Sequence, residues 1–179
     1  MRKIADSERI RNFMRALGAE AKKPAHVYFT GGATAVLLGW RSSTIDVDIR
    51  IFPESDRLLR VLPILKERLE INVELACPAD FIPELRGWKD RGLFVSQEGK
   101  LLFFHYDLYA QALAKIERSH AQDIADVGEM LRTGRIDPRR VREFFNEIEP
   151  KLFRYPAIDP SAFRRAVEQI LADAGTIES

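Results

Sequence analysis

The sequence has very little cysteine and histidine for its 179 residues. Its one cysteine, Cys77, cannot form a disulfide within the chain, and its histidines at positions 26, 105 and 120 lack the spacing of metal sites. No apolar run approaches the roughly 20 residues of a membrane-spanning helix, and residues 1–6 lack the apolar stretch of a signal peptide. These absences lead us to expect a cytoplasmic protein with no membrane partner.

Three glycine motifs are also missing, and each absence removes a class of protein. The sequence has no G-x-S-x-G elbow, no Walker-type glycine–lysine loop and no G-x-G-x-x-G fingerprint. What remains is an ordinary globular composition, with 46% hydrophobic and 31% charged residues and a net charge of +1. The charge is uneven, because residues 1–23 and 132–165 are basic whereas residues 24–131 are acidic. An acidic centre between basic ends suits a metal site that serves a polyanion, although solvated helices also carry such arginines.

The spacing of apolar residues divides the chain into a mixed first part and a helical second part. Alternation predicts strands over residues 26–29, 45–52, 71–75, 93–97 and 101–106. Helical spacing predicts helices over residues 7–17, 33–40 and 55–69, the last interrupted near Pro63. After Asp107 the pattern is helical, and Asp-Pro pairs at 137–138 and 159–160 open two further helices. We therefore expect an α/β (α+β) fold, with an α/β core over residues 1–106 and a helical subdomain over residues 107–179.

Two aspartates occupy the strand predicted over residues 45–52. Alternate side chains of a strand point to opposite faces, so Asp46 and Asp48 emerge on one side. Ile45, Val47 and Ile49 are expected to pack on the other side. Two carboxylates this close repel each other unless a cation or solvent neutralises them. An exposed strand face with two harmless aspartates would show the same pattern, so the pair by itself does not define a function.

The residues around this pair form a longer motif. Residues 28–49, "YFTGGATAVLLGWRSSTIDVDI", place a double glycine and a short apolar helix before Asp-x-Asp. This arrangement resembles the signature of the nucleotidyltransferase superfamily related to DNA polymerase beta, and "RSSTIDVDI" is similar to its bacterial toxin and abortive-infection members. Residues 108–131, "LYAQALAKIERSHAQDIADVGEML", resemble the helical Lys…Arg…Asp-x-x-Asp segment of the same families. The resemblance implies a small mixed sheet backed by helices, with the helical subdomain completing the nucleotide site.

The resemblance also implies a catalytic site that depends on a metal ion. Mg²⁺ or Mn²⁺ would be held by Asp46 and Asp48, because hard cations prefer oxygen ligands and these side chains share one rigid surface. Such sites usually have a third catalytic carboxylate on a neighbouring strand. Glu74 is the better candidate for it and Asp80 the weaker. A strand that merely faces solvent would present Glu74 in the same way.

For the nucleotide, the resemblance implies a phosphate contact at Gly31 and Gly32, whose bare backbone lets phosphate oxygens approach. Relatives often carry serine where this chain has Gly32. The candidates for the missing hydroxyl are Thr34, Ser42, Ser43 and Thr44. The second motif adds Lys115, Arg118 and Asp123 to the nucleotide site, although a lysine at this position could instead extend from the helix edge to water.

The sequence therefore predicts a nucleotidyltransferase, which moves a nucleoside monophosphate from an NTP to an acceptor hydroxyl and releases pyrophosphate. The likeness to toxin-type enzymes implies that the acceptor is a tRNA or other RNA end, or a protein hydroxyl, and that an antitoxin protein is a partner. Two alternatives stay open. One is a small-molecule acceptor, as in antibiotic-modifying relatives, and the other is a catalytically inactive binding module of the same fold.

Overall fold

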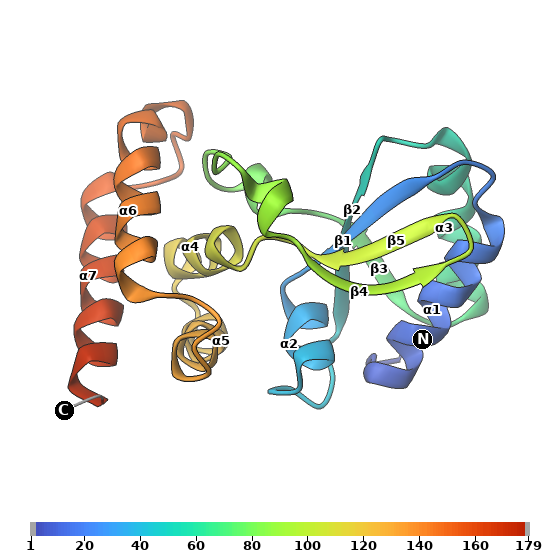
Figure 1. Cartoon of the computed structure of the whole chain (residues 1–179), viewed down its shortest axis with the longest axis horizontal. Helices are drawn as coiled ribbons and strands as arrows, with labels where there is room; N and C mark the ends of the chain where they lie inside the picture. Colours follow the sequence, from blue (N-terminus) through green and yellow to red (C-terminus); the bar gives the residue numbers. More distant parts are fainter. Residues whose placement is uncertain (1–2, 178–179) are drawn as a thin grey trace. The chain divides into compact units, whose positions relative to one another are not determined.

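The computed structural model describes residues 3–177, and its contacts divide the chain into two compact units. The first, which we call the sheet unit, comprises the chain up to Cys77 together with residues 92–106. The second, the helical unit, comprises residues 78–91 and the chain from Asp107 onward. Figure 1 labels the elements of both units. One boundary between the units falls after Tyr106, and residues 78–91 belong to the helical unit.

The sheet unit is built on one five-stranded mixed sheet. Its strands are β1 (Ala25–Thr30), β2 (Asp46–Phe52), β3 (Asn72–Leu75), β4 (Leu93–Glu98) and β5 (Leu101–His105). Their order across the sheet is β3-β2-β1-β5-β4. Strand β1 is antiparallel to β2 and parallel to β5, β2 is parallel to β3, and β4 forms an antiparallel hairpin with β5. This architecture confirms the predicted fold class of a small mixed sheet backed by helices.

Three helices cover one face of this sheet and create the core. They are α1 (Ser7–Glu20), α2 (Gly32–Leu38) and α3 (Asp56–Arg68). Helix α1 begins where the Asp6 side chain accepts a hydrogen bond from the backbone N–H of Arg9, and α3 where Ser55 accepts one from Leu58. The core joins apolar side chains of the helices to those of the inward sheet face, among them Phe13, Leu17, Leu62, Leu65, Val27, Phe29, Val47, Ile49, Val73 and Phe103.

Two local expectations for the sheet unit are corrected by the structure. Ile45, expected in the core, is 72% exposed, because β2 begins only at Asp46 and the side-chain alternation that buries Val47 and Ile49 begins there. Helix α3, expected to break near Pro63, is continuous through it. A proline removes one hydrogen bond from a helix interior, and the burial of the surrounding leucines of α3 offsets that cost.

The helical unit contains four α-helices in its described part. They are α4 (Leu108–Arg118), α5 (Ala121–Arg132), α6 (Pro138–Ile148) and α7 (Pro160–Ile177). Both Asp-Pro helix starts are confirmed, because the Asp137 and Asp159 side chains accept hydrogen bonds from the backbone N–H groups of Arg139 and Ser161. The 3-10 helices are η1 (Pro78–Asp80), η2 (Trp88–Arg91) and η3 (Glu149–Arg154).

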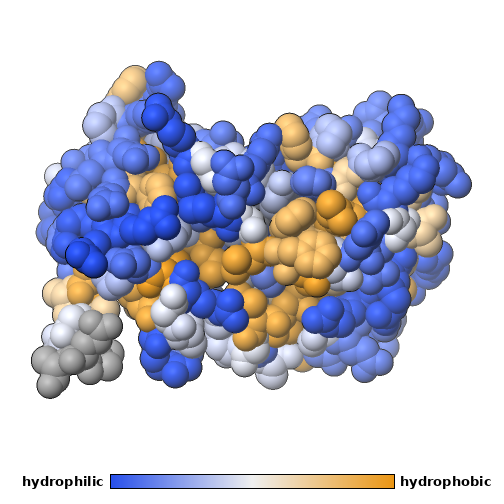
Figure 2. Space-filling model, viewed as in Figure 1, coloured by the Kyte–Doolittle hydropathy of each residue, from blue (hydrophilic) through white to orange (hydrophobic). Residues whose placement is uncertain are grey.

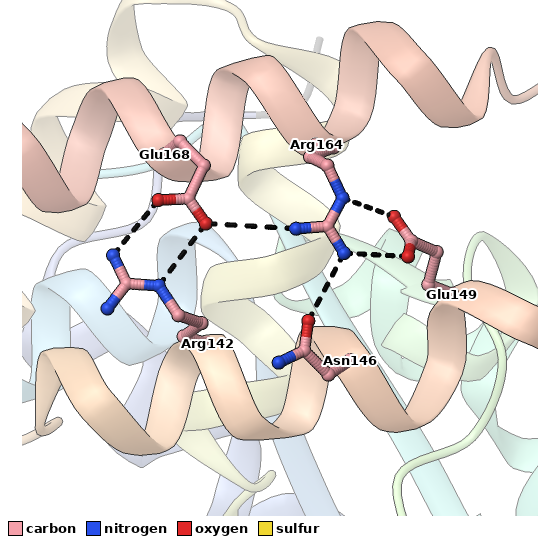
Figure 3. Close-up of polar contacts among 5 residues, drawn as sticks. All are labelled: Arg142, Asn146, Glu149, Arg164 and Glu168. Atoms are coloured by element: carbon pink, nitrogen blue, oxygen red, sulfur yellow. Dashed lines mark hydrogen bonds and ion pairs between the residues drawn. The ribbon is translucent and has the colours of Figure 1, made fainter.

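Helices α6 and α7 are joined by polar contacts on their exposed sides, which Figure 3 shows in close-up. The Arg142 guanidinium donates to both carboxylate oxygens of Glu168, at 3.2 and 2.9 Å. Arg164 binds Glu149 in the same bidentate way, at 2.7 and 2.6 Å, and also donates to Asn146 Oδ1 at 3.2 Å. These residues lie at helix surfaces, so we attribute the packing of α6 on α7 mainly to buried rings and aliphatic side chains.

Apolar side chains also reach the surface of both units. The large ones that are exposed are Ile4, Ile45, Phe52, Ile64, Leu75, Phe81, Leu93, Phe94 and Phe153. Figure 2 shows patches of hydrophobic surface bordered by hydrophilic surface. Within residues 3–177, no helix is both long enough and apolar enough to span a membrane.

Candidate active site

The two aspartates of the predicted motif lie on the sheet face opposite the helices. Asp46 and Asp48 are half-buried, whereas Val47 between them is fully buried on the core side. Strand β2 is held by a neighbour on each side, β1 and β3. Asp48 pairs in register with both β1 and β3, and Asp46 pairs with β3. The predicted side-chain alternation of Asp46, Val47, Asp48 and Ile49 is observed.

The neighbouring strand places two more polar side chains beside them. In the pairing of β2 with β3, Asn72 lies opposite Asp46 and Glu74 lies opposite Asp48. The Asn72 amide donates a hydrogen bond to Asp46 Oδ1 and a second one, at 3.3 Å, to Glu74 Oε1. We call these four residues the carboxylate strand pair. The Asn72 amide lies between the carboxylates of Asp46 and Glu74, so it reduces the repulsion between them.

Asn72 is a site residue that the sequence patterns alone did not single out. Its signal was present, because Asn72 and Glu74 alternate with the apolar residues of the strand predicted over 71–75. Glu70, which precedes them, lies outside β3 and pairs instead with Lys3, with Nζ and Oε2 at 2.6 Å. Only the strand register shows that Asn72 and Glu74 are the residues beside the aspartates.

The donor set of this surface suits a hard divalent cation. Carboxylate oxygens on one rigid strand are the ligands that Mg²⁺ and Mn²⁺ prefer. Within residues 3–177, however, no three histidine, cysteine, aspartate or glutamate side chains gather closely enough to hold a metal ion. Glu74 is exposed and stands beside Asp48 in register without forming a three-carboxylate cluster with the aspartates. Asp80, the weaker candidate for the third carboxylate, belongs to η1 of the helical unit.

The double glycine lies close to Asp48 of the carboxylate strand pair and to Thr44. Gly31 has a φ of 62°, a backbone conformation that favours glycine. A Cβ atom on Gly31 would lie 3.2 Å from Asp48 Oδ2. A side chain at Gly32 would begin only 2.1 Å from the Thr44 hydroxyl oxygen and 2.8 Å from Thr44 Cβ. Both positions therefore exclude side chains, because the turn after β1 lies directly against Asp48 and against the segment that leads into β2.

The hydroxyl groups proposed for phosphate contact fall into two environments. Thr34 is fully buried; its hydroxyl donates to the Phe29 carbonyl at 3.3 Å and lies 3.0 Å from His105 Nδ1. The structure thus gives Thr34 a role in packing, in place of the expected phosphate contact. Thr44 is half-buried beside Gly32 and donates to the backbone carbonyl of Asp46 at 3.0 Å. Ser43 is half-buried and Ser42 exposed in the same segment.

Aromatic side chains and an arginine continue the same sheet face. Arg50 follows Asp46 and Asp48 in the side-chain alternation of β2 and pairs in register with Tyr28 of β1. The Tyr28 ring stacks on Phe104 with centroids 5.5 Å apart, and its hydroxyl lies 3.3 Å from His26 Nδ1. Burial raises the pKa of the Tyr28 hydroxyl above its usual 10.0, and the charge of Arg50 offsets part of that rise.

The predicted residues of the second motif come together in the helical unit. The Lys115 ammonium donates to Asp126 Oδ2 at 2.7 Å and to Asp123 Oδ1 at 3.2 Å, and Arg118 also donates to Asp123 Oδ1, at 3.0 Å. We call these four residues the Lys115 cluster. Helix α4 supplies its two cations and α5 its two aspartates, which share a helix face because they are three residues apart.

The charges of the Lys115 cluster are balanced, and three of its four residues are buried. Lys115 is only 3% exposed, and Asp123 and Asp126 are also buried, so the alternative in which this lysine extends to water is wrong. Lysine has three N–H donors, and the two aspartates account for two of them. A phosphate that bound Lys115 would do so in the presence of two carboxylates. Asp126, unlike Asp123, belongs to the cluster without having been predicted as a site residue.

The fold and the carboxylate strand pair define the class of this protein. A mixed sheet whose β2 strand presents Asp-x-Asp, next to a double-glycine turn and a short helix, is the arrangement of the nucleotidyltransferase superfamily named above. A family model described as "Nucleotidyltransferase of unknown function (DUF6036)" matches residues 7–164. The chain therefore belongs to this nucleotidyltransferase family. Comparisons with curated proteins and with solved structures found no match.

Proposed function

We propose that the protein is a metal-dependent nucleotidyltransferase, which transfers a nucleoside monophosphate from an NTP to an acceptor hydroxyl. The observation that carries this proposal is the placement of Asp46 and Asp48 on one face of β2, with Asp48 against the bare Gly31 turn. These carboxylates and that of Glu74 on the neighbouring strand carry like charges, which repel each other. A bound cation would relieve that repulsion.

Asp46 and Asp48 are the residues that would hold Mg²⁺ or Mn²⁺. The metal, when bound, neutralises charge on the triphosphate and on the departing pyrophosphate. Asn72 orients Asp46 through its amide hydrogen bond, and Glu74 is the proposed third catalytic carboxylate. The backbone of Gly31 and Gly32 is the proposed phosphate contact, with the Thr44 hydroxyl beside Gly32. Ser43, Lys115, Arg118 and Asp123 remain predicted to contact the nucleotide.

For the acceptor we propose an RNA end such as that of tRNA, as in a toxin that is countered by an antitoxin protein. The support is the basic surface at the start of α6. Arg135 and Arg139 are exposed there and suit phosphate contacts, whereas Arg142 is paired with Glu168. Arg140 lies over the rings of Tyr109 and Phe144, 5.0 and 5.2 Å from their centroids.

A labelling experiment tests both the reaction and the acceptor. The protein is incubated with Mg²⁺ or Mn²⁺ and each α-labelled NTP in turn, with total RNA, protein extract or aminoglycosides as acceptors. We expect label in RNA, no label with Asp48→Asn, and normal label with Asp90→Asn, which changes an exposed carboxylate outside the site. Label in protein or in the small molecule would replace the RNA acceptor. Nucleotide binding without transfer to any acceptor would favour the inactive binding module.

The arginines provide a separate test of the RNA surface. Arg135→Glu with Arg139→Glu should weaken RNA binding and reduce its salt dependence, by about one unit of slope for each phosphate that the protein no longer binds. The affinity for NTP should not change. An unchanged salt dependence would place the acceptor elsewhere.

A further inference from the structure

The segment between α2 and β2 carries an arginine back toward the glycine turn. Helix α2 ends at Gly39, whose φ is 99°, and the backbone N–H groups of Trp40 and Arg41 then donate to the Ala35 carbonyl at 3.1 and 3.3 Å. The chain therefore folds back tightly along α2. Arg41 Nη1 lies at the other end of the helix, 3.2 Å from the position that a Cβ atom on Gly32 would occupy.

The guanidinium of Arg41 and the carboxylate of Asp48 thus flank two consecutive glycines. The Asp48 Oδ2 atom lies 3.2 Å from the corresponding side-chain position of Gly31. The Thr44 hydroxyl is next to Gly32 on the same side as Arg41. The anion Asp48 is therefore next to Gly31, and the cation Arg41 and the Thr44 hydroxyl are next to Gly32. Arg41 is half-buried there.

We propose that Arg41 binds a phosphate group of the NTP directly, with Thr44 beside it, and this inference rests on the proposed nucleotidyltransferase function. A guanidinium offers five N–H donors in a planar fork that matches two phosphate oxygens. The carboxylates of Asp46 and Asp48 attract a cation, so they would repel a triphosphate without a positive charge nearby. Arg41 supplies that charge on the other side of the same turn.

A different role for Arg41 would be to hold the Asp48 carboxylate in place. The two roles predict different responses to a metal ion alone. A residue that only positions Asp48 would, when removed, lower the affinity of the nucleotide-free protein for Mn²⁺. A residue that binds phosphate would leave that affinity unchanged or raise it, because removing a positive charge favours a cation at the nearby carboxylates.

Two calorimetric titrations distinguish phosphate binding by Arg41 from positioning of Asp48. They are carried out on wild type, Arg41→Gln, Arg41→Lys and Arg60→Gln. Arg60 is an exposed arginine of α3 and serves as the matched control. The probes are Mn²⁺ alone and inorganic triphosphate with Mg²⁺, each repeated with the four NTPs. We expect Arg41→Gln to weaken inorganic triphosphate and every NTP by the same factor, about tenfold to a hundredfold, with Mn²⁺ affinity not lowered. Arg41→Lys should fall between wild type and Arg41→Gln, because it keeps the charge and loses the fork.

Each other outcome overturns the proposal in a recognisable way. Equal triphosphate affinity in wild type and Arg41→Gln refutes the role of Arg41 and leaves the nucleotidyltransferase function standing. A joint fall of triphosphate and Mn²⁺ affinity shows that Arg41 only positions Asp48. Failure of the wild type to bind any triphosphate refutes this inference and the proposed function together. If Arg41→Gln does not fold, as judged by circular dichroism, the same comparison is made on Arg41→Lys.

Discussion

The two units each hold a group of charged residues, and the groups are compensated in opposite ways. In the helical unit, buried Lys115 and exposed Arg118 neutralise the buried Asp123 and Asp126. In the sheet unit, Asp46, Asp48 and Glu74 lie side by side on two strands, with the Asn72 amide as the neutral group between them. Asp46 and Asp48 are only half-buried, so water partly screens them.

We therefore expect the carboxylate strand pair, rather than the Lys115 cluster, to depend on a cation from outside the chain. Buried charges must be balanced within the protein, because an uncompensated charge in the interior costs several kcal/mol. Half-exposed like charges are tolerated while solvent screens them, and they become more favourable when a cation binds. The helical unit should therefore lose stability when a charge is removed, whereas the carboxylate strand pair should lose function and keep its fold.

The largest effect is expected at the carboxylate strand pair. Asp46→Asn or Asp48→Asn should reduce nucleotide transfer at least about a hundredfold, because loss of a metal ligand costs several kcal/mol and each 1.4 kcal/mol is about tenfold in rate. Melting of the metal-free protein should be unchanged or higher, since a like-charge repulsion is removed. Transfer is measured with labelled NTP and melting by circular dichroism. A variant that transfers nucleotide at the wild-type rate would contradict the proposal that the carboxylate strand pair, unlike the Lys115 cluster, serves function rather than stability.

The second effect concerns the stability of the helical unit. Lys115→Met leaves Asp123 and Asp126 buried beside each other, and we expect a loss of about 3–5 kcal/mol in the free energy of unfolding measured with urea. Adding Asp123→Asn and Asp126→Asn should recover much of that loss. Arg118→Met is the matched control and should cost less than about 1 kcal/mol, because Arg118 is largely solvent-exposed. A Lys115→Met protein as stable as wild type would show that the two buried aspartates do not need Lys115.

The third effect tests the close approach at the glycine turn. Gly32→Ala should destabilise the sheet unit by about 1–3 kcal/mol, because its new Cβ would lie 2.1 Å from the Thr44 hydroxyl oxygen. Combining it with Thr44→Gly removes the clash and should recover part of the loss. The control is Gly128→Ala in α5, where no atom lies within 4 Å of the new Cβ. That change should stabilise by about 0.5–1 kcal/mol, as expected for a helix interior.

The smallest effect is a pH dependence at the surface of the helical unit. The hydrogen bond and charge of Arg142 lower the pKa of Glu168 below its usual 4.5. A carboxyl group whose pKa is lower in the folded state stabilises the fold above its unfolded pKa and loses that contribution as the pH falls through the folded value. Glu168→Gln should therefore have a free energy of unfolding lower than that of wild type by less than about 1 kcal/mol at pH 7, and the difference should shrink as the pH falls below the usual pKa of 4.5. Glu143→Gln, which changes an exposed glutamate of α6, is the control in the same series.

Most helices and strands could be predicted from the sequence because their signals are local. The Asp-Pro starts of α6 and α7 and the alternation of β2 depend only on residues close in the chain. The exceptions have tertiary causes. Helix α3 continues through Pro63 because its leucines are buried, and Ile45 is exposed because pairing begins one residue later. Residues 78–91 have no local signal that assigns them to the helical unit.

The candidate site was predictable to the same extent. Alternation predicted that Asp46 and Asp48 share one strand face, and the resemblance singled out Lys115, Arg118 and Asp123, which lie together in the structure. Thr34 was expected to contact phosphate and is instead buried against Phe29 and His105, because the face of a short helix that is turned inward depends on what it packs against. Asn72 and Arg41 gain their places from strand register and from the turn after α2, which no local pattern specifies.

The sequence by itself determined the class of the protein and the chemistry of its residues. A double glycine and Asp-x-Asp at this spacing specify bare backbone and paired carboxylates, since glycine and strand geometry act over a few residues. Only the tertiary structure decided which side chains surround them. Asn72 meets Asp46 through strand pairing, Thr44 and Arg41 meet Gly32 through a reversal of the chain, and Lys115 is buried against two aspartates of another helix. These contacts join residues distant in the sequence, and their formation depends on the burial of the apolar core beneath them.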